Sequence, residues 1–173
     1  MRGKGCLTTG FIGIRFILPT LCDIGEADLA YELIAKRDYP SWGYMLENGA
    51  TTVWERWNGY TKENGFEDPE MNSFNHYSLG SCVEWLYSYV LGIKLDEDTE
   101  EVTIKPTVSE RLTFARGGTK VNGGKISVCW KREENVVTIE VAADGGVKYN
   151  VDTEDRKILS KEKNGNNIKL IMK

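Results

Sequence analysis

One short stretch of the chain gathers side chains that could do chemistry on a sugar. Residues 48–58 read Asn-Gly-Ala-Thr-Thr-Val-Trp-Glu-Arg-Trp-Asn, which puts Glu55 between Trp54 and Trp57 with Arg56 beside it. A carboxylate can act as acid or base on a glycosidic bond or on water, and indole rings stack on the C–H faces of sugars. The same residues also fit a buried Glu–Arg pair in an aromatic core, so the stretch by itself leaves both interpretations open.

The composition is that of an ordinary globular protein. The chain has 173 residues, of which 40% are hydrophobic and 28% charged, and this length suits one large or two small domains. The net charge is −4, and the basic residues are scattered along the chain. Both features argue against nucleic acid or an anionic membrane as the main partner.

The cysteines and the single histidine give no sign of a metal site or a cofactor. The four cysteines have no CxxC or zinc-finger spacing: Cys6, Cys22, Cys82 and Cys129. One histidine, His76, cannot build a histidine-rich metal centre. We therefore predict reduced, mostly buried thiols in a reducing compartment, with no metal and no cofactor.

The N-terminal residues resemble a signal peptide only superficially. An apolar run covers residues 11–18, but Arg15 interrupts it, Pro19 follows it, and no small-x-small cleavage site stands out. No apolar run reaches the roughly 18 residues of a membrane span. The sequence predicts a soluble, unprocessed, cytoplasmic protein.

Up to about Leu95, the spacing of apolar residues predicts helices. The expected elements are a helix from a Thr9 cap through Leu21, an amphipathic helix over 26–37 that ends before Pro40, an irregular or extended segment over 42–50, a helix beginning near Thr52, a polar loop over 58–69, and a long helix from Ser73 to a cap at Gly92. The first of these is apolar most of the way round, so we expect it to be buried.

After Leu95 the apolar period changes to two, which indicates strands. The expected strands centre on Val102–Ile104, Leu112–Phe114, Ile126–Trp130, Val137–Val141, Val147–Val151, Ile158 and Ile168–Met172, with turns at 123–124, 134–135, 145–146 and 164–165. Short strands at this spacing are typical of a β-sandwich. We therefore predict two domains, residues 1–95 and residues 96–173.

Several short words of sequence resemble, in their order, those of one enzyme family. They are Leu-Thr-Thr-Gly-Phe at 7–11, Asp-Leu-Ala-Tyr at 28–31, Tyr-Pro-Ser-Trp-Gly-Tyr-Met at 39–45, Gly-Ala-Thr-Thr-Val-Trp-Glu-Arg-Trp at 49–57, Met-Asn-Ser-Phe-Asn-His-Tyr at 71–77 and Leu-Thr-Phe-Ala-Arg-Gly at 112–117. Together they resemble the bacterial α-L-rhamnosidases, which are inverting glycoside hydrolases of family 78. The resemblance covers nearly the whole chain. It implies an α+β, multidomain protein in which residues 1–95 are the terminal helices of an incomplete (α/α)6 toroid and residues 96–173 an antiparallel β-sandwich.

The resemblance also implies roles for individual residues. Glu55 matches the general base that activates water, and His76 matches a residue that binds rhamnose. Trp42, Trp54 and Trp57 are lesser candidates for lining the sugar pocket, and each could equally belong to the core. We expect Arg56 to lie close to Glu55 and to keep its carboxylate ionised.

One departure from the family limits what the chain is expected to do. The family's general acid, and the acidic cluster with which it holds the sugar, lie upstream of the position of Leu7 and have no counterpart here. Other carboxylates, such as Glu47 and Glu70, are interpreted as surface groups. We therefore expect a fragment of an enzyme acting on rhamnose-containing glycosides, inactive by itself. The alternative is a non-catalytic carbohydrate-binding or structural remnant.

The first half also carries more large apolar groups than so few helices can bury. Phe11, Phe16 and Trp85 are expected to be partly exposed, and the chain is expected to self-associate through these helices.

Overall fold

The structure is a computed structural model that describes residues 7, 9–96, 98–154 and 156–173. The chain divides into two compact units, Met1–Val83 and Glu84–Lys173. The first strand of the second unit begins at Ile93, close to the change of apolar period. The domain boundary after residue 95 stays a prediction. Cys6 lies outside the described residues.

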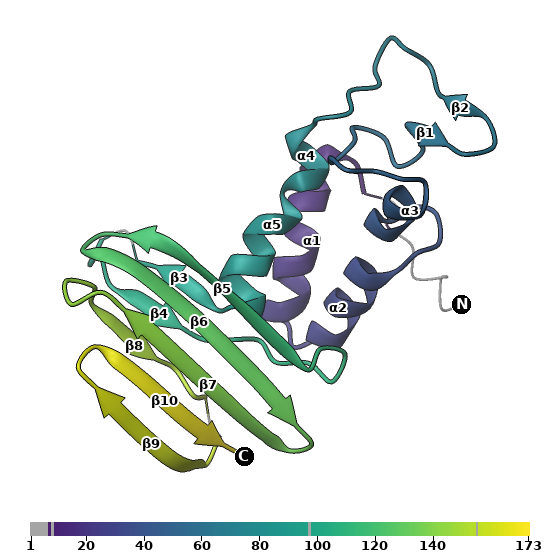
Figure 1. Cartoon of the computed structure of the whole chain (residues 1–173). Coiled ribbons are helices and arrows are strands. Elements are labelled where there is room, and N and C mark those ends of the chain that lie inside the picture. The colour runs from purple at the N-terminus through teal and green to yellow at the C-terminus, as the bar shows by residue number, and fades with distance from the viewer. Residues whose placement is uncertain (1–6, 8, 97, 155) are drawn as a thin grey trace. The chain divides into compact units, whose positions relative to one another are not determined.

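The first unit is built mainly from short helices (Figure 1). Its elements are α1 (Phe11–Asp23), α2 (Ala27–Ala35), α3 (Trp42–Glu47), the two-stranded hairpin β1 (Tyr60–Thr61) and β2 (Gly65–Phe66), and α4 (Tyr77–Gly80). The predicted helices over 9–21 and 26–37 are confirmed as α1 and α2, although the first begins later than expected. Gly10, not Thr9, occupies its N-cap position, and no side chain caps it.

The burial of α1 corrects one expectation and bears out another. Ile14 and Leu18 are buried, whereas Phe11, Ile12 and Phe16 are 45%, 85% and 57% exposed. A single apolar stripe of α1 packs on α2 and α4, so the expectation that the whole helix is buried was wrong. The predicted exposure of Phe11 and Phe16 is confirmed, but Trp85 is only 1% exposed. Self-association stays a prediction.

The segment between α2 and α4 differs from what the sequence predicts. A short helix, α3, replaces the irregular segment expected over 42–50, because the buried Ser41 hydroxyl accepts the Tyr44 N–H at 3.0 Å and caps it. The helix expected from Thr52 is absent, and residues 51–59 instead form bends and turns. Their backbone groups bond to a segment distant in sequence, which outweighs local helix propensity.

The long helix expected from Ser73 begins four residues later and is divided. Its parts are α4, α5 (Cys82–Trp85) and the π-helix η1 (Leu86–Val90). Gly92 follows with a φ of +71°, a left-handed conformation that suits glycine and ends the helix as predicted.

The second unit contains two sheets (Figure 1). The larger is antiparallel, in the order β5-β6-β7-β10-β9, and its strands are β5 (Phe114–Val121), β6 (Gly124–Glu133), β7 (Val136–Ala143), β9 (Ile158–Asn164) and β10 (Asn167–Met172). The smaller, in the order β3-β4-β8, contains β3 (Ile93–Leu95), β4 (Val102–Ile104) and β8 (Tyr149–Val151). The strand predicted over Leu112–Phe114 meets β5 only at Phe114, and the other predicted strands overlap observed ones. Strands β4 and β8 run parallel, so the smaller sheet is not fully antiparallel.

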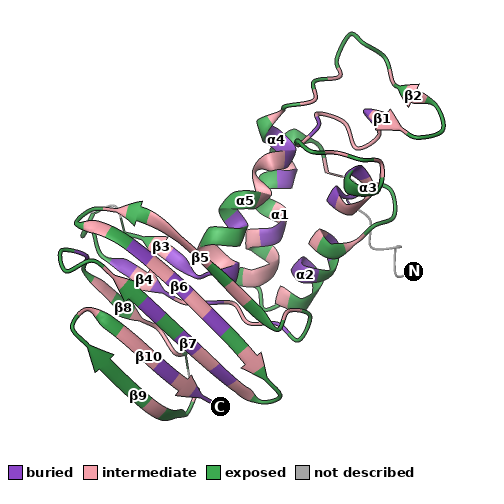
Figure 2. Cartoon of the chain, viewed as in Figure 1, coloured by how far each residue is buried: buried purple, intermediate pink, exposed green. Residues whose placement is uncertain are grey.

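Burial alternates along the central strands of the large sheet (Figure 2). Ile126, Val128 and Trp130 on β6 face the core, and Trp130 donates its indole N–H to the Val90 carbonyl at 2.7 Å. Gly117 on β5 leaves room for Leu91, because a Cβ there would lie 2.5 Å from the leucine Cδ1. One face of this sheet therefore packs into the core, and the side chains that alternate with the buried ones point outward.

Among the described residues, no helix has the length and apolar character needed to span a membrane. The described thiols, Cys22, Cys82 and Cys129, form no disulfide and are half-buried rather than buried. Burial raises the pKa of the Cys82 thiol to about 11, so this thiol is a poor nucleophile at neutral pH.

Candidate active site

Two segments that are distant in sequence lie side by side in the first unit and bring the predicted site residues together. The His76 N–H donates to the Val53 carbonyl at 2.9 Å, and the Glu55 N–H donates to the Ser73 carbonyl at 2.8 Å. The Thr52 hydroxyl bonds to the Phe74 carbonyl between them. Residues 52–55 and residues 73–76 thus form a short two-stranded arrangement, in which Glu55 belongs to the first segment and His76 to the second.

Glu55 lies half-buried in a bend, and its carboxylate is oriented by the backbone of the opposite segment. The Ser73 N–H donates to Glu55 Oε2 at 2.9 Å. A charge-assisted bond of this kind fixes one oxygen and leaves the other for a water molecule. Within the described part of the chain no ion pair joins Glu55 to Arg56, so the expected partner was wrong and a backbone amide holds the carboxylate instead.

Hydrogen bonding and ring stacking fix the orientation of the His76 ring and the nitrogen that accepts a hydrogen bond. It is the N-cap of α4, where its Nδ1 accepts the Ser78 N–H at 3.3 Å. The neutral ring then carries its proton on Nε2, which becomes a hydrogen-bond donor. The ring stacks on those of Phe11 and Tyr77. The distances between ring centroids are 5.0 Å to Phe11 and 5.4 Å to Tyr77, and the angles between ring planes are 25° and 11°.

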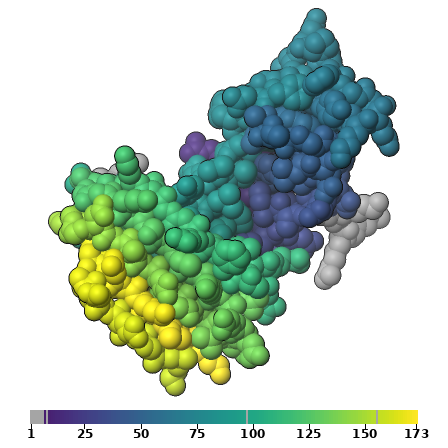
Figure 3. All heavy atoms as spheres, in the orientation of Figure 1, coloured from purple at the N-terminus to yellow at the C-terminus, as the bar shows by residue number. Residues whose placement is uncertain are grey.

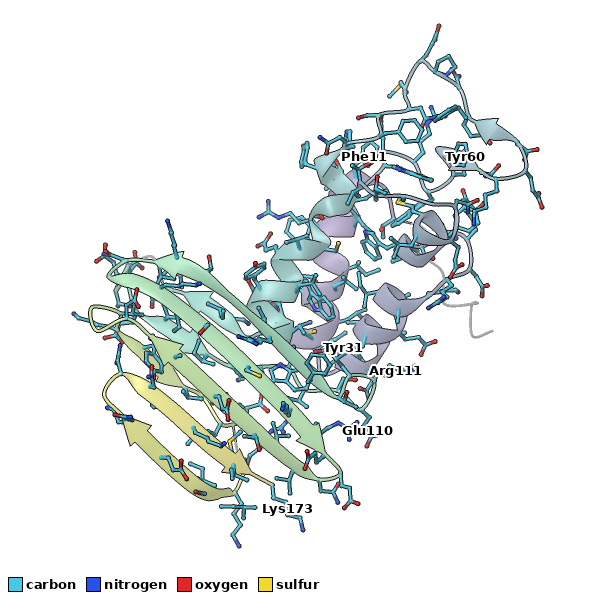
Figure 4. All side chains as sticks on the ribbon, in the orientation of Figure 1. Phe11, Tyr31, Tyr60, Glu110, Arg111 and Lys173 are labelled. Carbon is cyan, nitrogen blue, oxygen red and sulfur yellow. The ribbon has the colours of Figure 1, made fainter. Side chains whose placement is uncertain are left out.

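Phe11 is a functional candidate that the sequence pattern did not reveal. It is the first residue of α1, and it is labelled in Figure 4 together with Tyr60 of β1. Its side chain belongs to one of the family-like words, but only the fold shows that it stacks on the histidine of another word. Its partial exposure leaves ring surface beside His76 that can meet a ligand.

The three candidate tryptophans differ in position. Trp42 is 8% exposed, donates its indole N–H to the Leu79 carbonyl at 2.8 Å and meets the Trp57 ring edge-on at 5.2 Å. Trp54 is 4% exposed and packs edge-on against Phe74 at 5.4 Å. Trp57 is half-buried. Trp42 and Trp54 therefore lie in the core of the first unit, and Trp57 retains accessible surface.

The loop between the paired segments is also anchored. The Asn72 side-chain amide donates to the Gly59 carbonyl at 2.8 Å. A row of edge-on ring contacts joins four residues at 5.1–6.3 Å: Trp54, Tyr60, Phe66 and Phe74. These contacts fix the spacing between the Glu55 segment and the His76 segment.

The remaining acidic groups near this site do not converge on Glu55. Glu47 is exposed and bonds to Arg37, and Glu70 is exposed. No group of three or more candidate metal-ligating residues was found in the described part of the chain. The site is thus one oriented carboxylate, one oriented imidazole and a set of aromatic faces, which suits a sugar hydrolase.

Comparisons with known proteins identify the family that this chain resembles. The family model described as the bacterial alpha-L-rhamnosidase 6 hairpin glycosidase domain matches residues 1–90. An alpha-L-rhamnosidase from Alteromonas sp. (strain LOR) is 39% identical over 149 residues, and one from Streptomyces avermitilis is 42% identical over 127 residues. The crystal structure of the Streptomyces avermitilis alpha-L-rhamnosidase complexed with L-rhamnose superposes with a TM-score of 0.78 at 31% identity over 97% of this chain.

The family model describes a glycosidase domain, so the class that the chain matches is that of the six-hairpin glycosidases. The match over residues 1–90 makes the family more specific: the chain belongs to the bacterial α-L-rhamnosidase family. The matched regions cover 86% and 73% of this chain but 16% and 12% of the Alteromonas and Streptomyces enzymes. The chain therefore spans about a sixth of the length of the first relative and about an eighth of the second.

Proposed function

We propose that this chain supplies the general base and one sugar-binding side of an inverting α-L-rhamnosidase site, which hydrolyses terminal α-L-rhamnose from glycosides. The pairing of residues 52–55 with residues 73–76 carries the proposal, because it holds the segment with the oriented Glu55 carboxylate against the segment with the oriented His76 imidazole. In this proposal residues 1–95 are the terminal helices of an (α/α)6 toroid, and residues 96–173 are a β-sandwich. Relatives at up to 42% identity that are named alpha-L-rhamnosidases support it.

Glu55 acts on water in this mechanism. Its ionised carboxylate takes one proton from a water molecule while the water oxygen bonds to the anomeric carbon. The bond between that carbon and the glycosidic oxygen breaks on the opposite face, so the configuration inverts. The glycosidic oxygen takes its proton from a general acid, which in inverting enzymes lies about 6.5–9.5 Å from the base.

His76 and its aromatic neighbours bind and orient the sugar. The Nε2–H donates to a rhamnose hydroxyl, and the stack with Phe11 and Tyr77 keeps that donor aimed at the ligand. Trp57 lines the pocket, and Trp42 and Trp54 support it from the core. No carboxylate of this chain is assigned as the general acid, and Glu55 cannot protonate the leaving group while it deprotonates water. The isolated chain is therefore inactive in this proposal.

A second candidate function is a non-catalytic piece that binds rhamnose or only stabilises a larger assembly. The deep burial of Trp42 and Trp54 favours it, since buried rings take part in folding rather than in sugar contact. The two functions differ in what a full-length relative does when the residue matching Glu55 changes.

The test uses a full-length relative that carries the same sequence words. Changing the residue that matches Glu55 to Gln keeps the shape and removes the basicity, so kcat should fall about 10²- to 10⁴-fold while rhamnose binding survives. Changing the residue that matches His76 to Ala should weaken rhamnose binding and kcat/KM together. Unchanged kcat in the Gln variant would overturn the assignment of the base.

The isolated chain provides the matching measurement. We expect no measurable hydrolysis of an aryl α-L-rhamnoside by residues 1–173 alone. Robust turnover would instead mean that an exposed carboxylate acts as the acid, and Glu47→Gln and Glu70→Gln would identify which one.

A further inference from the structure

The outward face of the five-stranded sheet has an order that the rhamnosidase site does not explain. The strand register places one row of charged and polar side chains across it, in which Arg116 pairs with Cys129, Cys129 with Glu140, Glu140 with Lys169 and Lys169 with Glu162. All of these positions alternate with the buried residues, so they share the outward face. The atoms of this sheet form part of the surface in Figure 3, in green to yellow.

A second row on the same face consists of small and amide side chains. Gly118 pairs with Ser127, and Ser127 pairs with Ala142. Asn167 and Asn164, which pair with each other on the last two strands, continue it. We call these five residues the small-residue row. Because its side chains are short, the row is lower than the charged row beside it.

The two rows lie in one open concavity of about 1240 Å³, and all of its lining residues belong to the second unit. Its charge is opposite to that of the chain. The lining contains five cationic side chains, namely Arg116, Lys125, Lys131, Lys163 and Lys169, and two carboxylates, Glu140 and Glu162. The whole chain carries a net charge of −4. Glu140 and Lys169 bond at 2.8 Å and neutralise each other, which leaves the excess of cations intact.

The word Leu-Thr-Phe-Ala-Arg-Gly supplies two of the lining groups, although the rhamnosidase mechanism does not use it. Phe114 and Arg116 both lie on the edge strand β5 and both point into the concavity. Phe114 is 58% exposed, so its ring has a face that a ligand can cover. An aromatic face beside a guanidinium is suited to a sugar ring that carries a carboxylate.

We propose that this basic concavity binds an acidic glycan, a chain of sugar rings that bear carboxylates. The proposal draws on the proposed function only for the preference for sugar over other polyanions. The small-residue row lets rings lie against the sheet, Ser127 and the two asparagines bond to hydroxyl groups, and Arg116 and Lys125 bind carboxylates from either side of the row. Five strands about 4.8 Å apart span roughly four sugar rings.

The binding test uses the whole chain and an oligogalacturonate of about eight rings as the probe. Isothermal titration at low salt should give saturable binding that weakens as salt rises. A neutral oligosaccharide of the same length should bind at least about 10-fold more weakly, and absence of oligogalacturonate binding would overturn the proposal.

Matched variants locate the site. Arg116→Gln with Lys125→Gln should weaken binding at least about 10-fold, and Phe114→Ala should weaken it about 3- to 10-fold without changing the salt dependence. Lys148→Gln with Lys157→Gln removes the same charge from exposed positions outside the concavity and should leave the affinity within about 2-fold. Circular dichroism confirms that each variant is folded. Equal losses in both double variants would show attraction by net charge alone and would overturn the proposal.

Two further arms separate the alternatives. Single-stranded DNA of equal charge should bind more weakly than oligogalacturonate, and stronger binding of the DNA would replace the glycan by nucleic acid. Glu55→Gln should leave oligogalacturonate binding unchanged. Failure of the function proposed for Glu55 and failure of glycan binding at the concavity are therefore distinguishable.

Discussion

The two units of this chain position their side chains in different ways. In the second unit, strand register determines which residues face the core and which face outward, and each strand supports the next. In the first unit, Glu55 and His76 lie in bends and at a helix cap, and a few bonds between residues 52–55 and 73–76 hold them. Periodic sequence thus predicts the framework, whereas the arrangement of the candidate site depends on contacts between segments that no local pattern contains.

The largest effect is expected in the core of the second unit. Trp130 is fully buried and its indole N–H is bonded to Val90, so Trp130→Ala should lower the free energy of unfolding by about 3–5 kcal/mol. Urea unfolding followed by circular dichroism measures this. The neighbouring exposed Lys131→Ala should change it by less than about 0.5 kcal/mol. A small decrease in the free energy of unfolding for Trp130→Ala would show that packing around Trp130 contributes little to the stability of this unit.

The next effect concerns a cap in the first unit. Ser41 is fully buried and accepts the Tyr44 N–H, so Ser41→Ala should cost about 1 kcal/mol, while Ser41→Gly should cost only a few tenths. Amide hydrogen exchange at Tyr44 reports the change locally. If exchange at Tyr44 is unaltered in Ser41→Ala, the cap does not stabilise α3.

These two predictions match what the sequence could and could not reveal. The alternation Ile126, Val128, Trp130 predicts its strand because burial has the period of the strand itself. The helix at α3 was missed because Ser41 directly follows Pro40, which predicts the end of the preceding helix and gives no sign of a new one. The helix expected near Thr52 is absent because Val53 and Glu55 bond to residues 73–76, contacts that depend on the tertiary fold.

The candidate site divides in the same way. The family-like words identify Glu55 and His76 by resemblance, but neither the Ser73 amide on the carboxylate nor the Phe11 stack can be predicted from spacing. Both are contacts between residues far apart in sequence. The sequence therefore predicts which side chains belong to the candidate site, but it does not predict how they are oriented.

A sharper test of that orientation uses the single histidine of the chain. Phe11→Leu removes the stack on His76, so the dissociation constant for L-rhamnose should rise about 2- to 10-fold. The imidazole signals of His76 in proton NMR report binding without assignment. Phe16→Leu is the control, because Phe16 is exposed on the same helix and stacks on no histidine. Equal effects of the two variants would contradict a positioning role for Phe11.

The smallest effect is electrostatic and lies in the second unit. The Glu154 amide, followed by the Lys105 ammonium at 3.1 Å, lowers the pKa of Asp152 below its ordinary 3.8. A lowered carboxylate pKa stabilises the fold above the ordinary value, and this contribution is lost as pH falls through the folded pKa. Lys105→Gln should therefore cost about 0.2–1 kcal/mol at pH 7 and nothing near pH 2. Urea midpoints from pH 2 to pH 7 test this against Lys148→Gln, which should show no such trend.

The most direct test of the general base is chemical rescue in a full-length relative that carries the Trp-Glu-Arg-Trp word. With the matching glutamate changed to Gln, water is no longer deprotonated, but azide needs no base and can attack the same anomeric carbon. We expect azide to restore turnover and NMR to identify a rhamnosyl azide of inverted anomeric configuration, whereas azide should not accelerate the unchanged enzyme. A variant that azide fails to rescue, or a product of retained configuration, would contradict the role assigned to Glu55.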